Sequence, residues 1–113
     1  MHELSLCESV VQILDKSAKE QGFSTVKTVW LEIGALSCVE PEAMRFSFDV
    51  VTRGTLAAGA KLVIERVPAT ARCLSCLQDV SVNEYGDLCP ACGSSDLQIS
   101  GGDQLRVKEL EVV

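Results

Sequence analysis

The chain has 113 residues and a formal net charge of −6, and 47% of its residues are hydrophobic, enough for a buried core. This length allows one modest domain, or a small domain combined with a metal-stabilised module. The negative charge argues against nucleic acid as a partner, because binding to phosphates needs a basic face. The opening segment carries Glu3 and Glu8, unlike a signal peptide, and the uncharged runs are too short to span a membrane. We therefore expect a cytoplasmic protein with reduced thiols.

The first two elements in chain order are an amphipathic helix and a strand. From Leu4 to just before Gly22, apolar residues recur at intervals of three and four, which is the period of a helix with one buried face. The strand covers Val26 to Ile33 and alternates between apolar and polar side chains. One face holds Val29, Leu31 and Ile33, and the other holds Thr28, Trp30 and Glu32.

A second helix and two further strands follow. Pro41 suits the first turn of a helix that buries Met44, Phe48 and Val51 and stops near Gly54. The segments Lys61–Val67 and Leu105–Val112 have the composition of strands. Alternation in the last strand slips near Glu109, which is typical of a β-bulge.

Four cysteines between the last two strands form the strongest motif in the chain. Cys73 and Cys76 make one Cys-x2-Cys pair, and Cys89 and Cys92 make a second. Two such pairs can bring four thiolates to one tetrahedral zinc ion, which leaves no open position for catalysis. Two disulfides, four unrelated thiols or an iron ion in the same sulfur cage are the alternatives.

The order of these elements predicts an α+β fold. We expect a small sheet of about three strands packed with two helices, plus an inserted four-cysteine zinc-ribbon module. Residues 1–69 and 98–113 then form the α/β domain, and residues 70–97 form the insertion. Pro68 and the pair Gly101-Gly102 mark the places where the insertion could hinge, although connections this short are often stiff.

His2 is the only histidine, and it directly follows Met1. The α-amine, the backbone nitrogen of His2 and its imidazole can chelate one ion, with the backbone nitrogen of Glu3 as a fourth donor. Four nitrogen donors in a plane suit Ni²⁺ or Cu²⁺. The alternatives are that His2 is a solvated residue at a frayed terminus and that Glu3 complements the dipole of the first helix.

The whole chain resembles the HypA/HybF family of nickel metallochaperones for [NiFe]-hydrogenase maturation. The resemblance is carried by Met1-His2-Glu3, by the segments Val29–Gly34, Leu36–Glu42 and Phe46–Phe48, and by the two cysteine pairs, all in the family's order. No histidine follows either cysteine pair here, unlike in some members of the family, so a histidine-based pH switch at zinc is absent.

The resemblance implies that His2 binds nickel with the help of N-terminal backbone nitrogen, that Glu3 belongs to the same site, and that Cys73, Cys76, Cys89 and Cys92 hold structural zinc. The cargo is Ni²⁺, and the implied partners are a HypB-type GTPase accessory protein and the [NiFe]-hydrogenase large-subunit precursor. The chain has no catalytic constellation or phosphate-binding loop of its own, so we expect a metal carrier rather than an enzyme. We expect a monomer or a weak dimer.

Two other functions remain open at this point. The chain could be a zinc-ribbon protein adaptor without nickel transfer, or a rubredoxin-like electron carrier with iron at the four cysteines. The two remaining cysteines, Cys7 and Cys38, are expected to be small buried hydrophobic residues, and Cys38 is the better candidate for a ligand because a turn can expose it. Trp30 suits the core or an interface.

Overall fold

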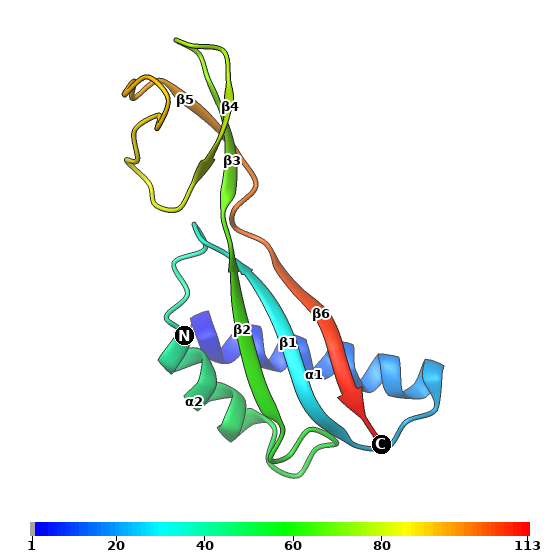
Figure 1. Ribbon diagram of the computed structural model, residues 1–113. Coiled ribbons are helices and arrows are strands. Elements are labelled where there is room, and N and C mark those ends of the chain that lie inside the picture. The colour runs from blue at the N-terminus through cyan, green and yellow to red at the C-terminus, as the bar shows by residue number, and fades with distance from the viewer. Residues whose placement is uncertain (1) are drawn as a thin grey trace. The chain divides into compact units, whose positions relative to one another are not determined.

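The computed structural model describes residues 2–113, and of His2 it describes the backbone only. These residues form two helices and six strands (Figure 1). The elements are α1 (His2–Gln21), β1 (Val26–Gly34), α2 (Pro41–Val51), β2 (Lys61–Val67), β3 (Ala69–Cys73), β4 (Asp79–Val82), β5 (Leu97–Ser100) and β6 (Leu105–Val112). The strands make two three-stranded sheets, ordered β2-β1-β6 and β4-β3-β5. The predicted α+β fold with two helices, a three-stranded sheet and a four-cysteine module is confirmed.

The chain divides into two compact units. The first comprises the residues up to Leu31, Val39–Glu65 and Val107–Val113, and the second comprises Glu32–Cys38 and Arg66–Arg106. Neither of the two helices among the described residues is both long enough and apolar enough to cross a lipid bilayer.

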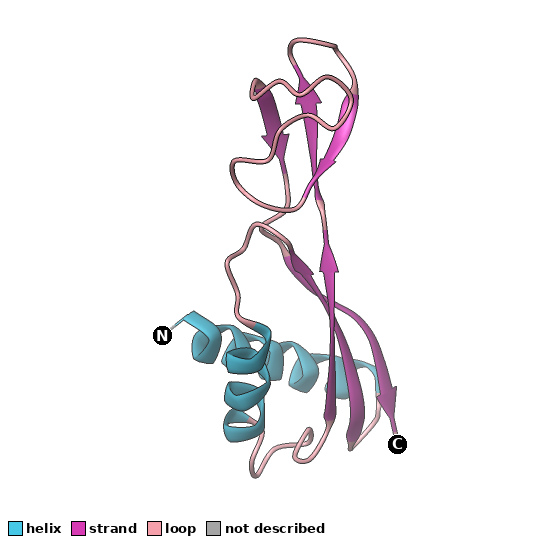
Figure 2. Cartoon of the chain, turned by 60° about the vertical axis from the view of Figure 1, so that its left-hand side comes forward, coloured by secondary structure: helices cyan, strands magenta, loops and turns pink. Residues whose placement is uncertain are grey.

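Helix α1 is amphipathic, and its apolar stripe forms much of the core of the first unit. Cys7, Val10 and Leu14 are fully buried, and α1 packs against α2. Figure 2 shows both helices on one side of the sheet β2-β1-β6. The helix ends where predicted, because Gly22 adopts a φ of +81° and its N–H donates to the carbonyl of Ala18 at 2.8 Å.

Strand β1 lies at the centre of the first sheet and has the predicted two faces. Val29, Leu31 and Ile33 are buried, whereas Trp30 and Glu32 are half-buried. Thr28, predicted on the same face as Trp30 and Glu32, is also buried, and its hydroxyl donates to Oε1 of Glu111 at 2.7 Å. The burial pattern of β6 alternates up to Lys108 and then slips, because Glu109 is exposed as well.

Helix α2 begins at Pro41, as predicted. Glu40 caps it, with one carboxylate oxygen accepting the N–H of Glu42 at 3.1 Å. Met44 and Phe48 are buried against the core, whereas Phe46 is 72% exposed.

The second sheet belongs to the four-cysteine module, and β3 pairs antiparallel with both β4 and β5. Its small core consists of Leu36, Ala69, Ala71 and Val82, with Val80 and Leu97 packed against it. Leu36 reaches this core from the segment that follows β1.

The backbone of residues 34–36 is hydrogen-bonded to two other segments of the second unit. The N–H of Ala35 donates to Val67 at 2.8 Å, and the N–H of Leu36 donates to the carbonyl of Gly102 at 2.7 Å. The N–H of Gly34 donates to the carbonyl of Gln104 at 2.7 Å. These bonds fix Gly102, one of the predicted hinge residues, within the second unit.

Candidate metal centres

Each Cys-x2-Cys pair forms the same tight turn. The N–H of Leu77 donates to the carbonyl of Cys73 at 2.8 Å, and the N–H of Gly93 donates to the carbonyl of Cys89 at 2.7 Å. The residue after the second cysteine is left-handed in both turns, with a φ of +63° at Leu77 and +78° at Gly93. The two turns therefore present their cysteines in equivalent ways.

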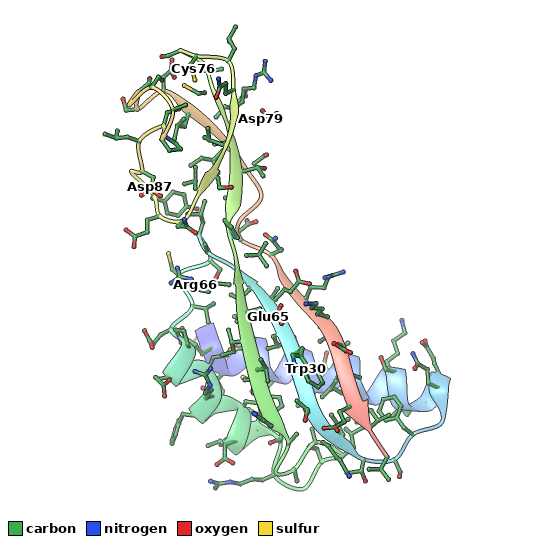
Figure 3. The ribbon with its side chains drawn as sticks, viewed as in Figure 1. Trp30, Glu65, Arg66, Cys76, Asp79 and Asp87 are labelled. Carbon is green, nitrogen blue, oxygen red and sulfur yellow. The ribbon has the colours of Figure 1, made fainter. Side chains whose placement is uncertain are left out.

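The four sulfur atoms of these turns lie within 4.8 Å of one another. The Sγ atoms of Cys73 and Cys92 are 3.5 Å apart, and those of Cys76 and Cys89 are 3.7 Å apart, in the region labelled Cys76 in Figure 3. A disulfide would need about 2.05 Å. A tetrahedron of sulfurs around one ion, with metal–sulfur bonds of about 2.3 Å, has edges of about 3.8 Å. The cluster therefore fits a single tetrahedral ion and excludes the two-disulfide alternative.

Hydrogen bonds stabilise the cluster without any help from a metal. The N–H of Cys76 donates to Sγ of Cys73 at 3.4 Å, and this backbone hydrogen bond lowers the pKa of the Cys73 thiol to about 6. The hydroxyls of Ser75 and Ser94 lie 2.8 Å apart and join the two turns. At Cys73 the thiolate form that a metal ion requires is favoured before the ion arrives. The pKa values of Cys76 and Cys92 are raised, because burial and hydrogen bonds with neighbouring cysteines outweigh their backbone hydrogen bonds.

The surroundings of the cluster are acidic. Residues 72–96 contain four acidic side chains (Asp79, Glu84, Asp87 and Asp96) and one basic side chain, Arg72. Arg72 lies 3.5 Å from Asp79 in an exposed ion pair. Four thiolates with a divalent cation would add a charge of about −2. This module has no basic face for nucleic acid.

The predicted nickel site lies at the start of α1. Met1 and the side chain of His2 are outside the described residues, whereas the backbone of His2 forms the first residue of the helix. The carboxylate of Glu3 accepts the N–H of Glu40 at 3.4 Å. This contact joins the first turn of α1 to the residue that caps α2, and no sequence pattern indicated it, because the two residues are 37 positions apart.

The two remaining cysteines differ in exposure. Cys7 is fully buried, and its thiol contacts the carbonyl oxygen of Met44 at 3.4 Å. Burial, and secondly the negative charge of Glu3, raise the pKa of Cys7 to about 11. The expectation of a small buried hydrophobic residue is confirmed for Cys7 and is wrong for Cys38, which is exposed in a turn with a φ of +61°.

The sequence matches proteins of one family over nearly its whole length. The family model "Hydrogenase/urease nickel incorporation, metallochaperone, hypA" matches residues 1–112. A hydrogenase maturation factor HypA from Acidithiobacillus ferrooxidans is 59% identical over 112 residues, covering 99% of both chains. Proteins of the same name from Rhodopseudomonas palustris and Azotobacter chroococcum are each 54% identical, again over 99% of both chains.

Solved structures agree with this fold. The solution structure of the nickel metallochaperone HypA from Helicobacter pylori aligns with a TM-score of 0.69 at 24% identity, covering 98% of this chain and 97% of that one. A second solution structure, of a HypA protein, aligns with a TM-score of 0.70 at 24% identity, covering 100% of this chain and 97% of that one.

Proposed function

Because this chain belongs to the HypA family of hydrogenase and urease nickel-incorporation metallochaperones, we propose that it binds Ni²⁺ at its N-terminus and delivers the ion to the large-subunit precursor of [NiFe]-hydrogenase. The observation that carries the proposal is the match of residues 1–112, which includes the Met1-His2-Glu3 opening. The work is that of a carrier in the cytoplasm and not of an enzyme.

The nickel donors in this proposal are the terminal amine, the backbone nitrogen and imidazole of His2, and the backbone nitrogen of Glu3, with the Glu3 side chain belonging to the same site. The position of these residues supports it. Because α1 begins at His2, its first N–H groups have no carbonyl partner within the helix and are available for other bonds. Nitrogen donors, including deprotonated amides, suit Ni²⁺.

Cys73, Cys76, Cys89 and Cys92 are assigned to structural zinc. The spacing of their sulfurs supports one tetrahedral ion, and four thiolates leave no position for a substrate. In this assignment residues 70–97 are an inserted zinc-binding domain, and residues 1–69 and 98–113 carry the nickel site.

Transfer needs a nickel site that an acceptor can reach. A site made from a chain terminus has few protein side chains around the ion, so ligands from an acceptor can displace them one at a time, whereas the thiolate cage retains its own ion. The sequence contains no phosphate-binding loop, so nucleotide energy would come from a partner such as a HypB-type GTPase accessory protein.

The test is a nickel titration of the zinc-loaded protein with a native, untagged N-terminus, followed by calorimetry and visible absorption. We expect about one Ni²⁺ per chain, with binding lost in His2→Ala, because the variant removes the imidazole donor. Phe46→Ala is the matched control, since Phe46 is exposed on α2 and offers no ligand atom.

Two outcomes would contradict the proposal. Unchanged nickel affinity in His2→Ala would remove His2 from the site, and no nickel binding by the parent protein would favour a zinc-ribbon adaptor. A visible absorption band of ferric thiolate in the purified protein would instead indicate iron at the four cysteines, because zinc thiolate is colourless.

A further inference from the structure

Leu77 has a backbone conformation that normally belongs to glycine. Its φ is +63°, in the left-handed region where a Cβ atom is disfavoured. The equivalent position of the second turn holds Gly93, with a φ of +78° and the same hydrogen bond to the first cysteine of its pair. The turn can therefore be built with glycine, and the leucine is not required for its geometry.

Packing does not account for this leucine either. Leu77 is 62% exposed and is not part of the core of the second unit. A strained residue that contributes little to packing is a reason to look for a function.

Two more exposed leucines adjoin the same cluster. Leu74, which follows Cys73, is 50% exposed, and Leu88, which precedes Cys89, is 57% exposed. The cysteine sulfurs lie within 4.8 Å of one another, and each leucine is one residue from a cysteine. Adding the length of a cysteine side chain and one Cα–Cα step at each end, the Cα atoms of the three leucines lie at most about 18 Å apart. One partner's side of a standard interface covers about 800 Å², so it is wide enough to include all three.

The charge around these leucines limits what can cover them. The formal charge of residues 72–96 is −3, and a metal thiolate centre makes it more negative. A second copy of this chain would bring the same acidic surface against itself, so self-association is disfavoured. The complementary surface is an apolar pocket bordered by Lys and Arg side chains.

We propose that Leu74, Leu77 and Leu88 form a docking surface, here called the leucine surface, for the protein that accepts the nickel. The proposal rests on the proposed function, and it gives that function a source of specificity. A terminal nickel site that offers mostly backbone nitrogen presents little by which one acceptor could be recognised. Recognition then needs side chains elsewhere, and exposed apolar anchors in an acidic segment supply them.

The experiment measures binding of the purified large-subunit precursor from the same organism to the zinc-loaded, nickel-free protein by calorimetry. Leu77→Asn replaces the apolar side chain by a polar one of similar size that tolerates a positive φ. We expect it to weaken binding about tenfold or more, as for an interface anchor. Leu77→Met keeps an apolar side chain and should stay within about threefold of the parent. Phe46→Asn, an exposed apolar residue on α2, should bind as the parent does.

Three further readouts separate this role from a structural one. The zinc content and nickel affinity of Leu77→Asn should equal those of the parent, and its thermal midpoint should be equal or higher, because the left-handed position is relieved. Raising the salt from about 50 to about 300 mM should weaken docking, since salt screens the attraction between the acidic residues 72–96 and a basic partner surface. His2→Ala should lose nickel and keep docking, so a failure of the nickel site and a failure of the leucine surface give different results.

The inference is overturned if Leu77→Asn binds the precursor within about twofold of the parent. It is also overturned if the variant loses binding only to the GTPase accessory protein, or if the leucines instead mediate self-association in analytical ultracentrifugation.

Discussion

Replacing Gly34 by Ala tests a close approach between two backbone segments of the second unit. A Cβ atom added at Gly34 would come within 3.0 Å of three backbone atoms of Gly102 and Asp103. Backbone atoms cannot move aside as a flexible side chain can. Gly34 itself has no positive φ, so the substitution introduces a steric clash without backbone strain of its own.

The expected cost follows from the contacts that must separate. Overpacking in a tight site costs about 1–3 kcal/mol. The hydrogen bonds from Gly34 to Gln104 and from Leu36 to Gly102, both 2.7 Å, would lengthen, at about 1 kcal/mol each. We therefore expect Gly34→Ala to lower the free energy of unfolding by about 3–5 kcal/mol, which is large for a single substitution.

Gly22→Ala is the matched control, because Gly22 has a φ of +81° and no atom within 4 Å of an added Cβ. It should cost only the strain of the left-handed conformation, about 1 kcal/mol. The free energies would come from urea unfolding of the zinc-saturated proteins, followed by circular dichroism. If the two variants differed by less than about 0.5 kcal/mol, the argument from the Gly34–Gly102 contact would be wrong.

Two further predictions concern the thiols. Cys73→Ala should release zinc in a colorimetric chelator assay, because the three thiolates that are left no longer enclose the ion. Amide hydrogen exchange should become faster in β3, β4 and β5, while α1 stays protected. Retention of one zinc per chain would contradict the assignment. In the zinc-loaded protein at pH 8, a disulfide reagent should modify Cys38 rapidly and Cys7 slowly, because Cys38 is exposed whereas a pKa of about 11 leaves Cys7 almost entirely protonated and burial blocks access. Cys38→Ser should remove the fast reaction, and a fast reaction that survives it would count against this picture.

Most of the first unit could be predicted from the sequence because its elements have strong local periodicity. The strand boundaries Lys61–Val67 and Leu105–Val112 are those of β2 and β6, and α2 begins at the predicted Pro41. The sequence predicts the end of α2 near Gly54, whereas the helix ends at Val51, with Thr52 as its C-cap and the N–H of Thr52 donating to the carbonyl of Phe48 at 3.0 Å. The sequence predicts the start of α1 at Leu4, two residues too late, because His2 and Glu3 are polar and precede the first residue of the apolar stripe.

For residues 70–97 the sequence predicts a metal module and no strands, whereas β3, β4 and β5 form there and just beyond. These three strands have only four or five residues, and β5 is mostly exposed, so no alternation develops. Leu36 lies in a turn after β1, and nothing near it in the sequence indicates that it packs on Ala69 and Val82. Such contacts are set by tertiary structure, whereas the cysteine spacing is a local signal and predicted the cluster correctly.

The two turns of the cysteine cluster have the same backbone but differ in the residue at their left-handed position, Leu77 in one and Gly93 in the other. Both turns need a left-handed residue after the second cysteine, and both make the same backbone hydrogen bond. Ser75 and Ser94 join them, so whatever stabilises one turn also stabilises the other. Selection for stability alone would favour glycine at both positions, because the unfavourable φ is shared. The first turn instead keeps an exposed leucine, and the strain that it carries is offset by the backbone hydrogen bond of the turn and by the contact between Ser75 and Ser94. In the proposed assignment, the closed zinc site gives the leucine surface a rigid base from which it can be presented to the nickel acceptor.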